Sequence, residues 1–145
     1  MKIGVMVQEG PYQHQAADSA YHFIQAARSR GHEISGVFLY MDGVNNVNQF
    51  ISPPGERNIA KRFDELGAEG IQIVACTACA KFRGMRPNLK VEHVRLLPST
   101  RGALETADPT GVIMARRRSH DSRSTSLRQL MQIDGATRFQ SMLAG

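Results

Sequence analysis

The chain has 145 residues, of which 41% are hydrophobic and 21% charged, with a formal net charge of +5 and two cysteines. This length is typical of a single domain, and the apolar fraction supplies a core without disulfide bonds. No apolar run approaches the roughly 18 residues that a membrane span needs, which excludes a membrane protein. We therefore expect one soluble, cytoplasmic domain over residues 1–145.

The positive charge is distributed unevenly along the chain. Residues 1–85 carry eight basic and eight acidic side chains, so the whole excess belongs to residues 86–145. A basic balance suggests an anionic partner such as nucleic acid. However, no aromatic residue is interleaved in the arginine run at 116–118, and the chain has no tryptophan. Because base stacking lacks its usual residues, nucleic acid is not the expected partner.

The first part of the chain predicts alternating strands and helices. The β-branched run at 2–7 is typical of a buried strand. From about residue 13, apolar side chains recur every three or four residues up to Gly31, which indicates an amphipathic helix with a glycine stop. A second strand is expected over 33–40. The Asn-, Gly- and Pro-rich residues 41–55 read as a long connection.

The same alternation continues to the first cysteine. Ile59, Phe63 and Leu66 mark one face of a second helix that ends at Gly67. A third strand is expected over 71–76. This β-α-β-α-β order predicts right-handed crossovers and a parallel sheet covered by helices on both faces, an α/β fold.

Residues 86–145 are patterned more weakly. Short apolar runs favour a fourth strand around 91–97 and a fifth around 111–114. A terminal helix over 124–143 is indicated by spaced leucines and methionines, with an interruption at 134–135. We treat residues 1–85 as the well-patterned core of the domain and 86–145 as its basic, atypical part.

Cys76 is the main candidate for chemistry. Ligands of parallel α/β sheets bind outside the carboxyl ends of the strands, and Cys76 ends the third strand. It also precedes a helix-like stretch over 77–82, where backbone N–H groups and the nearby Lys81 and Arg83 favour the thiolate and its nucleophilicity. The alternative is that Cys76 is only a small apolar residue that closes a strand.

The second cysteine, Cys79, completes a Cys-x-x-Cys pattern. That spacing suits a dithiol–disulfide oxidoreductase in which Cys79 is the resolving thiol. Thioredoxin-type chains usually carry the motif after the first strand with Pro or Gly between the cysteines, whereas here it follows the third strand and encloses Thr-Ala. Two cysteines alone do not form a zinc site, so we expect no metal.

Several other residues fall in loops at the same edge of the sheet. His14 is a candidate base or hydrogen-bond donor to an anion. The simpler interpretation is an exposed histidine at a helix start. Tyr12 lies in the first loop. Asn45 and Asn46 have the chemistry of loop-forming residues, and Arg83 follows the cysteines. The glycines match neither a dinucleotide fingerprint nor a Walker A loop, so no nucleotide cofactor is expected.

Three stretches of sequence resemble a known family. They are residues 9–16 (EGPYQHQA) with 18–21, residues 31–46 up to the DGVNN segment with the Ser-Pro-Pro at 52–54, and the strand ending at Cys76 with Arg83 and Gly84 beyond it. In order, spacing and identity these are similar to the DsrE/TusD family of intracellular sulfur-relay proteins, and closer to DsrE. The resemblance covers about residues 1–85.

The resemblance implies a three-layer α/β/α fold with a mainly parallel sheet of about five strands. It implies a sulfurtransferase without cofactor, in which Cys76 carries sulfane sulfur as a persulfide for sulfur oxidation or for tRNA thiolation. Cys79 stands where relatives usually have alanine. Family members assemble with DsrF/TusC-like and DsrH/TusB-like subunits into a hexamer, take sulfur from a TusA-like donor and pass it to a DsrC/TusE-like acceptor.

After about Arg86 the resemblance ends, and the arginine- and serine-rich residues that follow have no counterpart in the family. We therefore hypothesise that the chain after about residue 86 has a divergent or frame-shifted ending. Two strands formed by residues 91–114 within the sheet would contradict this hypothesis. A non-catalytic assembly subunit, or nucleic-acid binding through the basic part, remains the alternative from another functional class.

Overall fold

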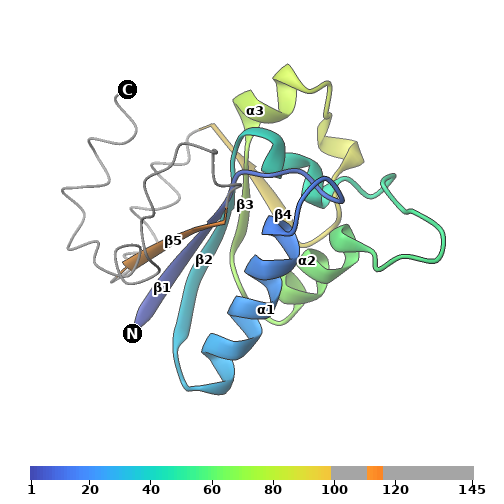
Figure 1. The fold of residues 1–145 in the computed structure, drawn as a ribbon. Helices are drawn as coiled ribbons and strands as arrows, with labels where there is room; N and C mark the ends of the chain where they lie inside the picture. Colours follow the sequence, from blue (N-terminus) through green and yellow to red (C-terminus); the bar gives the residue numbers. More distant parts are fainter. Residues whose placement is uncertain (99–110, 116–145) are drawn as a thin grey trace, which may run out of the picture.

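The computed structural model of the protein describes residues 1–98 and 111–115 (Figure 1). The strands in this part of the chain are β1 (Lys2–Val7), β2 (Glu33–Leu39), β3 (Ile73–Cys76), β4 (Val94–Leu97) and β5 (Gly111–Ala115). The helices are α1 (Ala16–Ser29), α2 (Ile59–Ala68) and α3 (Thr77–Phe82), with the 3-10 segments η1 (Met41–Val47) and η2 (Pro87–Leu89).

The strands form one sheet in the order β4-β3-β2-β1-β5, and every neighbouring pair is parallel. This confirms the parallel α/β fold. The carboxyl ends of β1, β2 and β3 therefore meet at one edge, where η1 and α3 begin (Figure 1). The candidate loops of the sequence lie at that edge.

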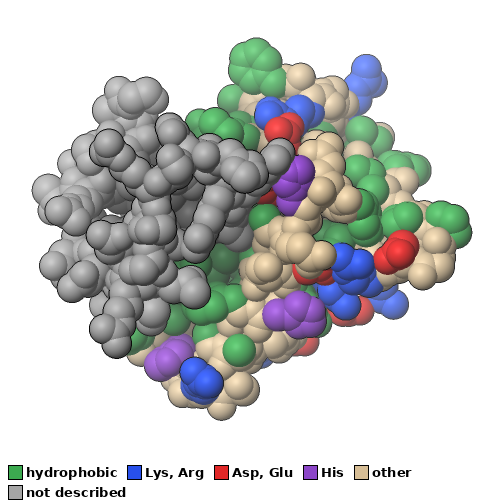
Figure 2. Space-filling view, viewed as in Figure 1, with side chains coloured by type: hydrophobic (Ala, Val, Ile, Leu, Met, Phe, Trp, Pro, Cys, Tyr) green, Lys and Arg blue, Asp and Glu red, His purple; other side chains and the backbone are tan. Residues whose placement is uncertain are grey.

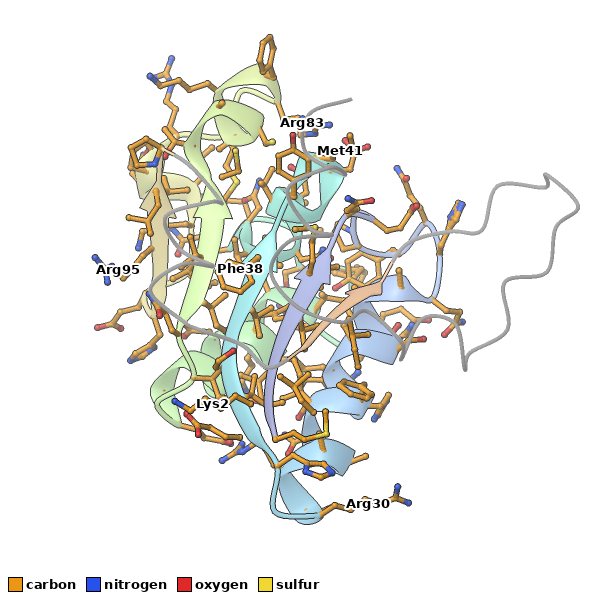
Figure 3. All side chains as sticks on the ribbon, turned by 90° about the vertical axis from the view of Figure 1, so that its left-hand side faces the viewer. Lys2, Arg30, Phe38, Met41, Arg83 and Arg95 are labelled. Atoms are coloured by element: carbon orange, nitrogen blue, oxygen red, sulfur yellow. The ribbon has the colours of Figure 1, made fainter. Side chains whose placement is uncertain are left out.

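Both faces of the sheet carry buried side chains. Val5, Val37 and Ile73 belong to the core shared with α1 and α2, which lie together on one side of the sheet (Figure 1). Alternation along the strands places Met6, Phe38 and Val74 on the opposite face, where they are also buried. Figure 3 shows Phe38 in the middle of that face. Side chains of the sheet are thus buried on both of its faces.

Some element boundaries differ from the prediction for local reasons. Helix α1 begins at Ala16 rather than near residue 13, because the preceding loop turns through Tyr12 at a φ of +66°. Strand β3 begins at Ile73 rather than 71. The N–H of Ile71 donates to the carbonyl of Leu66 at 3.1 Å, a bond that ends α2 around Gly70 at a φ of +91°.

The connection predicted over 41–55 contains a structured segment, η1. Its Gly43 passes so close to the end of β1 that a Cβ atom there would lie 2.1 Å from the Val7 carbonyl oxygen. The Gly43 N–H donates to the Gln8 carbonyl at 2.9 Å. Only glycine permits this approach, so η1 is packed directly against the first strand.

Residues beyond 86 also join the fold. Strand β4 pairs with β3 and strand β5 with β1, so the expectation that the family pattern stops near residue 86 is wrong for these segments. The fourth and fifth strands expected around 91–97 and 111–114 are present, with four and five residues. The arginine run at 116–118 and the helix predicted over 124–143 lie outside the described residues.

A partly buried ion cluster fixes α1 to the segment before α2. Asp18 is 6% exposed and accepts hydrogen bonds from Arg57 Nε at 2.7 Å and Arg62 Nη1 at 2.9 Å. The bond from Arg57 is the main reason why the pKa of Asp18 lies below its usual value. Arg62 in turn lies over the ring of Tyr21. These contacts stabilise the helical layer away from the cysteines.

Candidate functional site

Cys76 is placed as the sequence predicts. It ends the buried strand β3, is itself 5% exposed, and caps the N-terminus of α3. Its Sγ accepts a hydrogen bond from the Cys79 N–H at 3.5 Å. A thiolate or a sulfur-centred anion at this position is thus supported by a backbone donor of the first helical turn.

Cys79 is the third residue of α3, and its side chain lies against the same sulfur. Both cysteines are free thiols, and Cys79 is 9% exposed. Burial is the main cause that raises the pKa of the Cys79 thiol, and its hydrogen bond with Cys76 raises the pKa further. The Met41 N–H, bonded to the Cys79 sulfur, and the charge of Arg83 act in the opposite direction. At neutral pH, Cys79 is therefore a protonated thiol beside Cys76.

Arg83 connects α3 to η1 and does not offer a free guanidinium. Its Nε donates to Asp42 Oδ1 at 2.5 Å, and its Nη1 donates to the Cys79 carbonyl at 3.2 Å. Figure 3 shows Arg83 and Met41 close together at the end of the molecule beyond the strand tips. Met41 has a φ of +50°, unusual for a residue with a side chain. The cysteine pair is thus bordered by two elements held together at this point.

Tyr12 and His14 lie in the β1–α1 loop, and no hydrogen bond joins either of them to Cys76. The Tyr12 hydroxyl donates to the Arg57 carbonyl at 2.9 Å and accepts from the Ile59 N–H at 3.0 Å, which fixes the loop to the start of α2. The Nδ1 atom of His14 is buried without a hydrogen-bond partner. Tyr12 is therefore a loop-positioning residue.

Asn45 and Asn46 belong to η1 and differ in burial. Asn46 is completely buried, and its Nδ2 donates to the carbonyls of Glu9 at 2.7 Å and Gly43 at 2.9 Å. It therefore holds η1 against the β1–α1 loop and has no surface for a partner. Asn45 is partly exposed, and its carbonyl accepts from the Asn48 N–H at 3.2 Å.

Two contributors to the site carry no clear sequence signal. Asp42 reads as a turn residue, although it is the ion-pair partner of Arg83 across 41 positions. The Met41 N–H, which reaches the Cys79 sulfur, is a backbone group and depends only on the path of η1. The Asp-Gly pair at 42–43 was the one available hint of a tight local turn.

The surface around α3 is partly apolar. Phe82, the last residue of α3, is 89% exposed, and Met41 is 48% exposed. Figure 2 shows hydrophobic side chains on the surface at the end of the molecule where α3 lies. Within residues 1–98 and 111–115, no three His, Cys, Asp or Glu side chains gather as a metal site would require. Helices of this described part also lack the length and apolar character needed to cross a membrane.

Solved structures support the fold. The E. coli ychN protein superposes with a TM-score of 0.69 at 20% identity, covering 79% of this chain and 98% of that one. A protein of unknown function from Methanobacterium thermoautotrophicum gives 0.61 at 14% identity, covering 78% and 97%. At these identities the likeness concerns the fold alone.

Sequence comparison adds the family. The putative sulfurtransferase DsrE of Allochromatium vinosum is 48% identical over 87 residues, which are 59% of this chain and 67% of that protein. The sulfurtransferase TusD of an Enterobacter strain is 36% identical over 98 residues, 66% of this chain and 77% of that protein. The model of the DsrE/DsrF-like family matches residues 1–110, well past the boundary at 85 expected from the motifs. The chain therefore belongs to the DsrE/DsrF-like family.

Proposed function

We propose that the protein is a sulfurtransferase of a sulfur relay, in which Cys76 accepts sulfane sulfur as a persulfide and yields it to a partner thiol. The observation that carries this proposal is the placement of Cys76 at the strand-to-helix junction, with its Sγ accepting the Cys79 N–H at 3.5 Å. The two relatives named as sulfurtransferases give the reaction class.

The proposed reaction has two balanced steps. The Cys76 thiolate attacks the outer sulfur of a donor persulfide, the new S–S bond forms, and the donor leaves as a thiolate. An acceptor thiolate then attacks the outer sulfur of the Cys76 persulfide, and Cys76 leaves as a thiolate. The Cys79 N–H favours each state in which negative charge is on the Cys76 sulfur. Neither step requires a metal or an organic cofactor.

The proposed partners follow from the family. They are DsrF/TusC-like and DsrH/TusB-like subunits in a hexamer, a TusA-like donor and a DsrC/TusE-like acceptor, in sulfur oxidation or tRNA thiolation. The proposed compartment is the cytoplasm, a reducing environment in which the Cys76 and Cys79 thiols would stay reduced between transfers. The exposed Phe82 at the end of α3 offers apolar surface beside the cysteines.

A sulfur-loading experiment tests the proposal. The wild type, Cys76→Ser and Cys79→Ser are incubated anaerobically with a persulfidated donor protein, and intact masses are measured. A gain of about 32 Da, the mass of one sulfur atom, is expected in the wild type and in Cys79→Ser but not in Cys76→Ser. A sulfur adduct that survives Cys76→Ser would overturn the assignment of Cys76.

The same samples distinguish the dithiol alternative. An oxidoreductase would lose two hydrogens on reaction with a disulfide substrate, with no sulfane donor present, and would need both cysteines. If that reaction is fast and no sulfur adduct forms, the sulfurtransferase proposal fails in favour of the Cys-x-x-Cys oxidoreductase.

A further inference from the structure

The sulfur chemistry proposed above uses Cys76 alone, whereas the structure places a second thiol against it. Cys79 is 9% exposed, and its N–H donates to Cys76 Sγ at 3.5 Å. Cys76 caps α3, and Cys79 belongs to the first turn of this helix. Residues three apart across a helical turn have Cα atoms about 5 Å apart. That separation lies inside the range in which a disulfide closes without backbone movement.

We infer that Cys79 resolves the Cys76 persulfide from within the chain, releasing the bound sulfur as sulfide and leaving a Cys76–Cys79 disulfide. The inference rests on the proposed function, because it requires a persulfide on Cys76. It adds a second outcome for the carried sulfur: transfer to an acceptor, or reductive discharge when no acceptor collects it.

The step balances without an external reagent. The Cys79 thiolate attacks Sγ of Cys76, the S–S bond to the outer sulfur breaks, and hydrosulfide leaves. The two thiol-level sulfurs become a disulfide, and the sulfane sulfur is reduced to sulfide by the same two electrons. Cys79 loses its proton to solvent before the attack, and the hydrosulfide that leaves is protonated by water. An external thiol or dithiol reductant returns both cysteines to thiols for another round.

The internal thiol is already positioned beside the sulfur that it attacks. Cys79 belongs to the helical turn that Cys76 caps, and its N–H donates to Cys76 Sγ at 3.5 Å. Attack from within the same turn has the advantage of proximity over a bimolecular reaction. The Met41 N–H of η1 also interacts with the Cys79 sulfur.

The environment of Cys79 also determines the rate at which sulfide is released. Burial and the bond with Cys76 raise the pKa of the Cys79 thiol, so little attacking thiolate exists at neutral pH. Discharge is therefore slow at neutral pH, which leaves time for transfer to an acceptor, and it accelerates as pH rises toward that pKa.

The test uses the full chain loaded with inorganic polysulfide at pH 7 and freed of excess reagent under anaerobic conditions. Released sulfide and intact mass are followed over time between pH 6.5 and 9. For the wild type we expect one sulfide per protein and a final mass two hydrogens below the reduced form. The rate should rise about tenfold per pH unit while the thiol is mostly protonated.

Cys79→Ser is the matched variant because its hydroxyl keeps the size and hydrogen bonding of the thiol without its nucleophilicity. It should keep the persulfide and release sulfide at least about tenfold more slowly. Tryptic digestion supplies the location of the new bond, since residues 63–81 form one peptide that holds both cysteines. A loss of two hydrogens within that peptide identifies the internal disulfide.

Three outcomes decide the matter. Equal sulfide release by Cys79→Ser and the wild type would overturn the inference, as would a disulfide that links two chains. Absence of any sulfur adduct on wild-type Cys76 would instead overturn the proposed function. A thermal melt of Cys79→Ser that coincides with that of the wild type shows that slower release reflects the lost thiol and not unfolding.

Discussion

Two segments at the carboxyl edge of the sheet, η1 and α3, are built in contrasting ways. Segment η1 is held by buried backbone contacts: Gly43 lies against the end of β1, and Asn46 is fully buried between two loops. Helix α3 has six residues, ends in the exposed Phe82, and is tied to η1 through the exposed Asp42 carboxylate and the Cys79 sulfur. The rigid segment thus supports the reactive one, and substitutions separate the two roles.

The largest effect is expected from Gly43→Ala. A Cβ atom at this position would lie 2.1 Å from the Val7 carbonyl oxygen, so backbone must move, at a cost of at least about 3 kcal/mol in free energy of unfolding. Urea unfolding measures this loss in the free energy of unfolding. Gly55→Ala is the control: its φ of +74° strains alanine, but nothing lies within 4 Å, so about 1 kcal/mol is expected. Equal losses in both variants would show that η1 is not packed as described.

Asn46→Ala should follow with a loss of about 2 kcal/mol, because it removes two buried hydrogen bonds to the carbonyls of Glu9 and Gly43. The neighbouring Asn45→Ala is the matched comparison and should stay within about 0.5 kcal/mol of the wild type, since Asn45 is partly exposed. Thermal and urea unfolding both report the difference. A larger loss of stability in Asn45→Ala than in Asn46→Ala would contradict the conclusion that Asn46 holds η1 in place.

Asp42→Asn addresses the tie between η1 and α3. The carboxylate is 61% exposed, so removing its charge should cost less than about 1 kcal/mol in global stability. Local opening around α3 should become easier, and alkylation of Cys76 by iodoacetamide should accelerate by up to about fivefold. Glu33→Gln, which breaks the exposed pair with Lys2 at the other end of β2, should leave the alkylation rate unchanged. An unchanged rate in Asp42→Asn would mean that the ion pair does not limit access.

The smallest effect is expected from Cys76→Ser, which tests the pKa of the Cys79 thiol. In Cys76→Ser, burial of Cys79 persists, so its alkylation should need a higher pH than that of an ordinary cysteine, which titrates near about 8.5. The sign follows from burial, which disfavours the thiolate. The same variant in urea serves as the reference with an exposed thiol. If the pH midpoint of Cys79 alkylation in the folded variant lay at or below its midpoint in urea, the buried environment described for Cys79 would be contradicted.

The helices and strands with a regular spacing of hydrophobic residues could be predicted from the sequence. The junction between Cys76 and Thr77 is a local feature: an apolar run stops and a short helix begins, and the structure places both as predicted. The parallel order of β1, β2 and β3 followed from the helices between them. Local periodicity therefore sufficed for the strand that carries the candidate nucleophile.

What the sequence did not reveal depends on contacts between distant residues. Arg83 was expected to favour the Cys76 thiolate, whereas its guanidinium is paired with Asp42, which lies 41 positions away. The need for glycine at 43 arises from the Val7 carbonyl, which no local pattern indicates. Strand β5 was faint because its five residues gain their place by pairing with β1, more than 100 positions earlier. Such pairings are decided by the folded sheet and not by local propensity.

The position of β5 has a consequence for self-association. In the order β4-β3-β2-β1-β5, the first strand of the chain is interior only because a strand that comes more than 100 residues later covers it. A chain truncated after β4 would expose the unpaired N–H and C=O groups of β1, whose residues from Ile3 to Val7 are buried in the structure. An open, apolar edge of this kind is a template for pairing between copies. Residues Gly111–Ala115 therefore keep the apolar edge of β1 from pairing with another copy.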